Sequence, residues 1–373
     1  MIIGVPKEIK NHEYRIGLTP AGVKELVVNG HNVLVENNGG ASIGFDNEQY
    51  ITAGAKIIDT AAEIFANADM IIKVKEPQAI ECKMLRPGQI LFTYLHLAPD
   101  PQQTELLIAS GATCIAYETV TQNGGGLPLL APMSEVAGRM SIQAGAHALE
   151  KAQGGLGALL GGVPGVAPAK VLIIGGGVVG TQAARMAVGM GADVTIVDRS
   201  LPRLRQLDTE FDSRLKTVYS TADAMDQLIV EADLVIGAVL IPGAAAPKLV
   251  TAQHIKMMKK GAVIVDVAID QGGCFETSKA TTHQEPTYVV DDVVHYCVAN
   301  MPGGVARTST MALTNATMPF AVTLANKGAK QAMLDDAHLM AGLNVLGGKI
   351  TYKPVADVLG YDYVAAEDAI ATL

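Results

Sequence analysis

The stretch "VLIIGGGVVGTQAARMAVGMGADVTIVD" (residues 171–198) decides the fold of the second half of the chain. It opens with an apolar run typical of a buried strand, passes through a glycine-rich turn into a helix of small residues, and ends in a second apolar strand. The turn has the spacing G-x-G-x-x-G at Gly175, Gly177 and Gly180, and the second strand ends at Asp198. This order of parts is typical of a dinucleotide-binding βαβ unit.

Each part of this unit has a mechanical reason. Gly175 permits the tight turn, Gly177 lets a pyrophosphate approach the backbone, and Gly180 allows the helix to pack closely on the strand. The N-terminus of the helix presents its N–H groups and dipole to the phosphates. Asp198 stands 18 residues after Gly180, where a carboxylate can accept hydrogen bonds from the adenosine ribose. Such an acid repels a 2′-phosphate and therefore favours NAD over NADP, although the adjacent Arg199 could bind that phosphate. The alternative to a dinucleotide site is a glycine-rich turn that binds no ligand.

Short apolar runs alternate with helical patterns on both sides of this unit. Before residue 125 the predicted strands are "NVLVE" (32–36), "MIIKVK" (70–75), "QILFTYL" (89–95) and "TCIAYE" (113–118). From Lys170 onward they are "KVLIIG", "DVTIVD", "LVIGAV" and "GAVIVDVAID". The sequence therefore predicts an α/β protein with two Rossmann-like doubly wound domains, joined by long helices and separated by a cleft.

The segments between the two alternations indicate where the chain crosses from one domain to the other. A long helix of small residues opens near Pro132, and the segment "RTSTMALTNATMPFAVTLANKG" (307–328) is again helical by spacing. We expect a substrate domain of residues 1–128 plus 306–373 and a dinucleotide-binding domain of residues 129–305. The glycine-rich segment 154–170 is either a flexible linker or a packed loop.

Composition and charge exclude several classes of protein. The net charge of −9 and the lack of a Lys/Arg run argue against a nucleic-acid partner. The four cysteines have no metal-ligand spacing and lie mostly in apolar runs, so we read them as reduced core residues. The sequence has no leader-like segment and no apolar stretch long enough to span a membrane. We therefore expect a cytoplasmic protein without a membrane partner.

The opening stretch "GVPKEIKNHEYRIGLTP" (4–20) places many charges between a short strand and a Thr-Pro helix start. Together with residues 171–198, it resembles the two signature stretches shared by alanine dehydrogenases and the α-subunits of proton-translocating nicotinamide nucleotide transhydrogenases. The resemblance covers essentially the whole chain in the same domain order. The dehydrogenase branch is the nearer one, since no membrane spans follow the last helices.

The resemblance implies roles for four residues. Arg15 and Lys75 would hold the substrate carboxylate, His96 would act as a general acid/base, and Asp270 would be the second catalytic acid, also in contact with the cofactor. A guanidinium suits a carboxylate, and an imidazole suits proton transfer. On the residues alone, a surface arginine, a strand-end lysine and a satisfied core histidine are the alternatives.

The resemblance also implies NAD as cofactor and a set of further contacts to it. These residues lie at strand ends or helix starts, and they are Ser134, Val178, Arg203, Ser220, Val239, Leu240, Val267 and Met301. Ser134 is equally well read as a simple helix cap. No metal is expected, because Thr323 and Lys327 stand where some relatives place a metal-binding acid and histidine.

The implied activity is reversible oxidative deamination of L-alanine to pyruvate and ammonia, in a homohexamer. Two alternatives stay open. One is a transhydrogenase α-like subunit, which binds NAD but needs a membrane partner and no His96/Asp270 pair. The other is a catalytically silent NAD-sensing module, which would keep the glycines and Asp198 but have no use for Lys75, His96 and Asp270 together.

Overall fold

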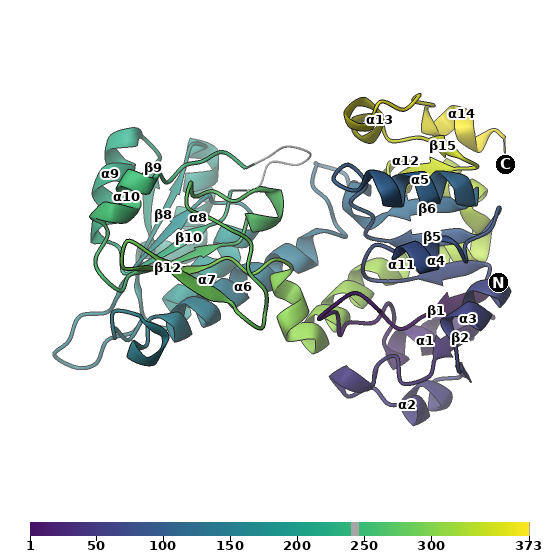
Figure 1. Cartoon of the computed structure of the whole chain (residues 1–373), viewed down its shortest axis with the longest axis horizontal. Helices are drawn as coiled ribbons and strands as arrows, with labels where there is room; N and C mark the ends of the chain where they lie inside the picture. Colours follow the sequence, from purple (N-terminus) through teal and green to yellow (C-terminus); the bar gives the residue numbers. More distant parts are fainter. Residues whose placement is uncertain (240–245, 373) are drawn as a thin grey trace. The chain divides into compact units, whose positions relative to one another are not determined.

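A computed structural model describes residues 1–239 and 246–372, which form two compact units. Unit 1 consists of Met1–Met133 together with the chain from Val305 onward, and unit 2 of Ser134–Gly304. The chain leaves unit 1 inside helix α6 (Ala131–Ala148) and re-enters it just before helix α11 (Ala306–Asp335). Both crossings are visible in Figure 1.

Unit 1 is built on an eight-stranded sheet of order β15-β14-β6-β5-β4-β1-β2-β3. The first six strands along the chain are parallel, whereas β14 pairs antiparallel with β6 and β15 antiparallel with β14. The strands are β1 (Ile2–Val5), β2 (Asn32–Glu36), β3 (Lys56–Ile58), β4 (Met70–Ile72), β5 (Ile90–Thr93), β6 (Thr113–Ala116), β14 (Leu343–Leu346) and β15 (Lys349–Ile350).

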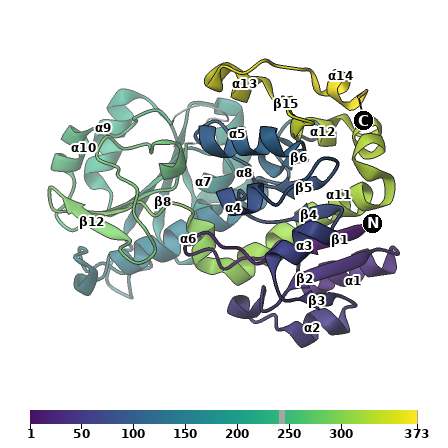
Figure 2. The same ribbon diagram turned by 45° about the vertical axis from the view of Figure 1, so that its right-hand side comes forward.

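Helices cover both faces of this sheet (Figures 1 and 2). Helix α1 packs against α11 on one face, while α3, α4 and α5 cover the other. Helix starts carry the expected signals: Thr19 caps α1 ahead of Pro20, and Asp100 caps α5 ahead of Pro101. The remaining bounds are α1 (Pro20–Val28), α2 (Asn47–Thr52), α3 (Ala61–Asn67), α4 (Ala79–Cys82), α5 (Pro101–Ser110), α12 (Ala337–Met340), α13 (Lys353–Leu359) and α14 (Ala366–Ile370).

Unit 2 is built on a seven-stranded sheet of order β12-β13-β11-β10-β7-β8-β9, parallel except for the edge strand β12. The strands are β7 (Lys170–Ile174), β8 (Asp193–Asp198), β9 (Lys216–Tyr219), β10 (Leu234–Gly237), β11 (Val263–Asp266), β12 (Thr287–Val290) and β13 (Val293–Tyr296). The helices are most of α6, with α7 (Val178–Gly189), α8 (Leu201–Phe211), α9 (Ala222–Glu231) and α10 (Ala252–Met257).

Successive residues of β7 point to opposite faces and build two cores. Val171 and Ile173 pack with residues of α6, α7 and α8, whereas Leu172 and Ile174 pack with residues of α9 and α10. A strand buried on both faces reads as a continuous apolar run, which is why its place in the sequence is easy to find.

The predicted doubly wound α/β fold is confirmed in both units, and Thr19 starts a helix as expected. The tail brings a difference: β14 and β15 follow the predicted helix and extend the sheet of unit 1. The segment 154–170 is partly a packed loop, because Leu160 is buried in the core of unit 2.

The four cysteines are buried and unpaired, as the sequence predicted for core residues. Burial raises the pKa of the Cys82 thiol and of the Cys274 thiol to about 12. Both are therefore thiols, not thiolates, at neutral pH.

Candidate active site

The carboxyl ends of three neighbouring strands in unit 1 carry the residues expected to bind and convert substrate. Arg15 follows β1, Lys75 follows β4 and His96 follows β5, and β4 lies between β1 and β5 in the sheet. The direction of winding reverses between β1 and β4, and α/β proteins bind ligands beyond the carboxyl ends of strands at such a reversal. The fold therefore brings these three residues to one edge of one sheet.

Arg15 is only 2% exposed and is held by its neighbour Glu13. Its Nε and Nη2 donate to the two Glu13 carboxylate oxygens over 2.7 and 2.5 Å, and Nη1 lies 3.1 Å from the Met133 sulfur. Burial alone lowers the pKa of Arg15, but the hydrogen bonds and charge of Glu13 outweigh it and raise the pKa. The guanidinium is thus a permanent cation in a fixed plane, which suits recognition of a carboxylate.

Lys75 has a mostly buried side chain whose Nζ lies 3.3 Å from Glu76 Oε2. Glu76 also pairs with Lys10, and these two cations lower its pKa to about 2 against the opposing effect of burial. The backbone is fixed as well, because the Lys75 carbonyl accepts a 3.0 Å hydrogen bond from Thr93 on β5. A second cation, the ammonium group of Lys75, therefore stands at the sheet edge that holds Arg15.

His96 has a left-handed backbone, with φ of 47°, and a side chain that is 42% exposed. Its backbone N–H donates to Glu118 Oε1 over 2.6 Å. This hydrogen bond stabilises the left-handed conformation, which is uncommon for residues other than glycine. Its ring stacks on Tyr94 at 5.7 Å between centroids, and Nδ1 lies 3.8 Å from Glu118 Oε1. An exposed, oriented imidazole can exchange protons with a bound ligand.

Sequence reasoning missed three residues that build this edge: Glu13, Tyr94 and Glu118. Burial raises the pKa of the Tyr94 phenol, whose hydroxyl donates to the Leu129 carbonyl over 2.5 Å, so the ring is a neutral and fixed support for His96. Two of the three left a signal, since Glu13 belongs to the charged opening stretch and Glu118 is the last residue of the predicted strand 113–118. Tyr94 lay inside an apolar run and left none.

The glycine turn of unit 2 has a different constraint at each glycine. Gly175 has φ of 103°, and a Cβ there would lie 2.9 Å from the Ala238 carbonyl oxygen. A Cβ at Gly180 would lie 1.8 Å from the Gly175 carbonyl oxygen, which no side chain can occupy. A Cβ at Gly177 would meet no described atom within 4 Å. The turn is thus closed toward the protein and open outward at Gly177.

Asp198 ends β8 and closes the turn from the side. Its Oδ2 accepts the Gly176 N–H over 2.7 Å and its Oδ1 accepts the Ser200 N–H over 2.8 Å. Arg203 approaches the same turn, with Nε donating to the Gly176 carbonyl over 2.6 Å and Nη2 to the Thr181 hydroxyl over 2.6 Å. Gly176, which the sequence motif leaves unspecified, is therefore the residue that joins the acid and the arginine.

The other residues expected to contact cofactor follow neighbouring strands of the same sheet. Ser220 follows β9 and donates its N–H to the Asp198 carbonyl over 3.0 Å, and Val239 and Val267 follow β10 and β11. Val178 is the first residue of α7, and Met301 begins the 3-10 helix η6 (Met301–Val305) and is buried. Ser134 lies inside α6, three residues past its first residue, so it does not cap the helix. Leu240 lies outside the described residues.

Asp270 and Asp266 have different surroundings, although they are only four residues apart. Asp270 is exposed in the 3-10 helix η5 (Ile269–Gln271), and its Oδ1 accepts the Asn300 N–H over 3.4 Å. Asp266 is fully buried at the end of β11 and accepts from the Cys274 N–H over 2.9 Å and from the Ser278 hydroxyl. Burial raises the pKa of Asp266. Asp266 therefore shapes the loop, while Asp270 is open to a ligand.

The residues at this edge fit a dinucleotide. Gly177 caps α7 without a side-chain hydrogen bond, so the first amides of this 12-residue helix face the open side of the turn, where a phosphate would be favoured. Within residues 1–239 and 246–372, no cluster of His, Cys, Asp and Glu side chains could hold a metal ion. Thr323 donates to the Pro319 carbonyl and Lys327 pairs with Asp335, so both are used within α11.

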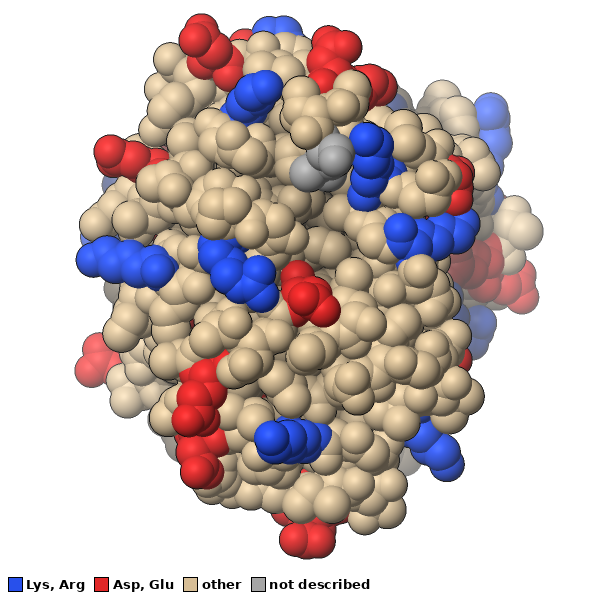
Figure 3. Space-filling model, turned by 90° about the vertical axis from the view of Figure 1, so that its right-hand side faces the viewer, with Lys and Arg blue, Asp and Glu red and all other residues tan. Residues whose placement is uncertain are grey.

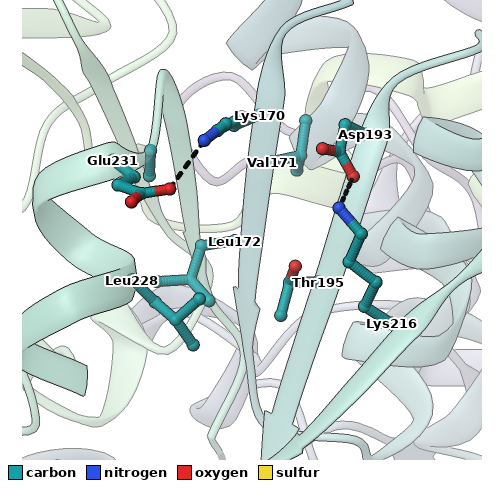
Figure 4. Close-up of a pocket in the computed structure, with 9 residues that line it drawn as sticks. Lys170, Val171, Leu172, Asp193, Thr195, Lys216, Leu228 and Glu231 are labelled. Carbon is teal, nitrogen blue, oxygen red and sulfur yellow. Dashed lines mark hydrogen bonds and ion pairs between the residues drawn. The ribbon is translucent and has the colours of Figure 1, made fainter. Parts of the chain in front are cut away.

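A separate pocket in unit 2 lies at the opposite, amino-terminal edge of its sheet (Figure 4). Lys170, Asp193 and Lys216 come from the first residues of β7, β8 and β9. Lys170 pairs with Glu231 over 2.6 Å, and Lys216 pairs with Asp193 over 2.5 Å. Because these charges neutralise one another and none of the expected residues is present, we do not assign the reaction to this pocket.

On the face drawn in Figure 3, basic and acidic side chains are scattered among other residues, without a continuous basic area. None of the helices in the described part of the chain combines the length and apolar character of a membrane span.

Comparisons with known proteins identify similar chains. Residues 4–137 match the family model "Alanine dehydrogenase/PNT, N-terminal domain", and residues 141–353 match "Alanine dehydrogenase/PNT, C-terminal domain". The alanine dehydrogenase of Halomonas elongata is 63% identical, covering 99% of this chain and 100% of that relative. That of Bacillus subtilis is 58% identical, covering 99% and 98%.

Two solved structures show the same fold. A structure of L-alanine dehydrogenase superimposes with a TM-score of 0.94 at 51% identity, covering 96% of this chain and 99% of that one. The transhydrogenase from Sinorhizobium meliloti superimposes with a TM-score of 0.81 at 25% identity, covering 94% and 99%.

Proposed function

Because this chain belongs to the alanine dehydrogenase/PNT family, we propose that it is an amino-acid dehydrogenase that catalyses the reversible oxidative deamination of L-alanine with NAD. In the forward direction L-alanine, NAD and water give pyruvate, ammonium, NADH and a proton. The observation that carries this proposal is the placement of Arg15, Lys75 and His96 after neighbouring strands at one sheet edge, in a chain that covers 100% and 98% of two alanine dehydrogenase relatives.

The substrate carboxylate is held by Arg15 and Lys75. The guanidinium of Arg15 supplies a positive charge in a plane fixed by Glu13, and the ammonium group of Lys75 adds a second charge. Two fixed cations orient the Cα of the substrate as well as its carboxylate. Alanine has only a methyl side chain, so this anchor supplies most of its orientation.

His96 and Asp270 divide the proton transfers. Asp270 positions and deprotonates the water that adds to the imine carbon, and His96 exchanges protons with the nitrogen and oxygen of the resulting carbinolamine. His96 has the exposure and the fixed backbone that this task needs, and Asp270 is exposed on its own unit. Bound NAD supplies the acceptor for the Cα hydride.

We propose NAD, not NADP, as the cofactor. Gly175, Gly177 and Gly180 would hold the pyrophosphate against α7, Asp198 would accept from the adenosine ribose, and Arg203 would cover the adenine or a phosphate. Further contacts would come from residues that follow neighbouring strands or lie in the first turns of helices, namely Ser134, Val178, Ser220, Val239, Leu240, Val267, Asp270 and Met301. The charge of Asp198 disfavours a 2′-phosphate. By resemblance, we also propose a homohexamer located in the cytoplasm.

The transhydrogenase α-like reading has less support. The transhydrogenase structure has the same fold, but its identity to this chain is 25%, against 51% for the L-alanine dehydrogenase structure. A silent NAD-sensing module explains the glycine turn but gives no reason for Lys75, His96 and Asp270.

The deciding experiment uses the purified chain with no other protein. We expect NADH absorbance to rise when L-alanine and NAD are added, and to fall when pyruvate, ammonium and NADH are added. His96→Ala is the control for a contaminating activity. If no NADH forms from neutral to alkaline pH while NADH still binds, the sensing module or the transhydrogenase-like subunit replaces this proposal.

A further inference from the structure

Lys73 is a buried cation that the proposed reaction does not use. It is 0% exposed, and its Nζ donates to Glu8 Oε2 over 2.9 Å and to Glu81 Oε1 over 2.7 Å. Both carboxylates are themselves buried. A buried ion pair contributes little net stability compared with apolar residues of the same size, so its presence beside a ligand-binding edge calls for another reason.

The two carboxylates do different things with their second oxygen. Glu8 Oε1 accepts the backbone N–H groups of Val74 and Lys75 over 2.6 and 3.3 Å. Glu81 Oε2 accepts the Gln78 N–H over 2.8 Å and so caps the short helix α4. Of these two carboxylates, only Glu8 therefore contacts the backbone of Lys75.

Glu8 also belongs to the segment that carries Arg15. Both lie in the connection between β1 and α1, and the neighbouring Lys7 N–H is anchored by Glu36 Oε2 over 2.7 Å. One carboxylate thus ties the connection after β1 to the residues that follow β4. These are the two segments that provide the proposed ligands of the substrate carboxylate.

We propose that Glu8, oriented by Lys73, is a positioning residue that sets the separation between Arg15 and Lys75. The inference rests on the proposed function, because it assumes that these two cations bind the substrate carboxylate. Lys73 cannot bind substrate itself, since its ammonium is buried between two carboxylates. Two ligands for one carboxylate must be placed to within a fraction of an ångström, and a fixed charge between their backbones does this more strictly than apolar packing.

The test compares Glu8→Gln with Glu81→Gln in the full chain. Each variant replaces one of the two carboxylates that pair with Lys73 by a neutral amide. Each should therefore lower the melting temperature. Only Glu8→Gln disturbs the Lys75 backbone. We expect it to raise the KM for pyruvate on the order of tenfold, with a smaller change in kcat, whereas Glu81→Gln should change the KM by less than about twofold. The dissociation constant of NADH should stay unchanged in both.

A second pair guards against loss of folding. Glu8→Asp keeps the charge that Lys73 needs but is one methylene too short to reach Lys73 and the Val74 and Lys75 amides together, and Glu81→Asp is its matched control. The same split in KM is expected. Equal KM changes in the members of each pair would overturn the inference and leave the cluster a merely structural one.

Failure of this inference can be told apart from failure of the proposed function. An unmodified chain that forms no NADH from alanine removes the proposed function first. If the chain is active and Lys75→Gln raises the KM for pyruvate while neither Glu8 variant does, only the positioning role is lost.

Discussion

A buried arginine beside a glutamate raises the question of whether the pair is merely structural. Glu13 occupies the edge of the guanidinium formed by Nε and Nη2. The two residues are only two positions apart in the sequence. The pair is therefore local and forms as soon as the segment is ordered. Such a pair fixes the plane of Arg15 before any ligand arrives, which lowers the entropy lost on binding.

Arg15→Lys should separate binding of substrate from binding of cofactor. Lysine keeps the charge but lacks the planar set of N–H groups that lets arginine bond to Glu13 and to a substrate carboxylate at once. We therefore expect the KM for pyruvate to rise by about a factor of ten or more. Steady-state kinetics measure this change, and fluorescence titration with NADH should give the wild-type dissociation constant. Arg205→Lys, on the exposed side of α8, is the control. An unchanged KM would make Arg15 a structural residue.

Asp198→Ala tests the choice of cofactor. The carboxylate closes the glycine turn through Gly176 and Ser200 and carries the charge that repels a 2′-phosphate. We expect weaker binding of NAD, a narrower preference for NAD over NADP, and little change in the KM for pyruvate. Dissociation constants for both cofactors decide the matter. If NADP stays excluded to the same degree, another group selects the cofactor.

At the scale of elements, the sequence predicted what local chemistry determines. The runs "NVLVE" and "DVTIVD" became β2 and β8 with the same bounds, because both are rich in β-branched apolar residues, which favour strands and are mostly buried here. The family resemblance implied roles for Lys75, His96 and Asp270, and each of them also stands at or directly after the end of a predicted strand. Strand ends in a doubly wound sheet share one edge, so a one-dimensional pattern carries three-dimensional information.

The parts that the sequence did not predict depend on partners distant in the chain. Strand β14 has only four residues and is defined by antiparallel pairing with β6, more than two hundred residues earlier. The predicted strand "MIIKVK" ends at Ile72, and the N–H groups of Val74 and Lys75 donate to the Glu8 carboxylate, which lies 66 residues or more earlier in the chain. Tyr94 and Glu118 likewise acquire their roles only from the position of His96.

The start of α7 offers a pair of substitutions with opposite signatures. Gly180→Ala places a methyl group on the Gly175 carbonyl, so it should cost about 3 kcal/mol or more of stability and abolish NADH binding. Gly177→Ala meets no described atom and should cost less than about 1 kcal/mol, yet weaken NADH binding, since it fills the space for the pyrophosphate. Melting curves and NADH titrations separate the two. Equal loss of stability in both variants would contradict this assignment.

At the scale of the whole molecule, two units with the same winding carry different chemistry. In each, the chain order of the parallel strands across the sheet is third, second, first, fourth, fifth, sixth, so each has a reversal point beside its first strand. Unit 1 places cations and an imidazole there, and unit 2 places a glycine turn and an acid. Neither unit alone holds both proposed catalytic residues, since His96 belongs to unit 1 and Asp270 to unit 2.

The strongest test of the proposed roles of His96 and Asp270 is therefore a double substitution. If His96 passes protons and Asp270 activates water at the same carbon, His96→Ala and Asp270→Asn should each abolish most turnover while NADH binding stays intact. The double variant should then be little slower than the slower single variant, because groups that act as a unit are strongly non-additive.

The pH dependence adds a second readout to this cycle. Each substitution removes an ionisable group from the proton transfers, so the residual activity should lose one limb of the pH–rate profile of the unmodified enzyme. Turnover of both single variants and the double variant across the pH range is the measurement. Losses that multiply fully, with an unaltered profile, would mean that the two residues do not share a step. The acid/base role would then rest on one of them alone, and the other would only shape its own unit.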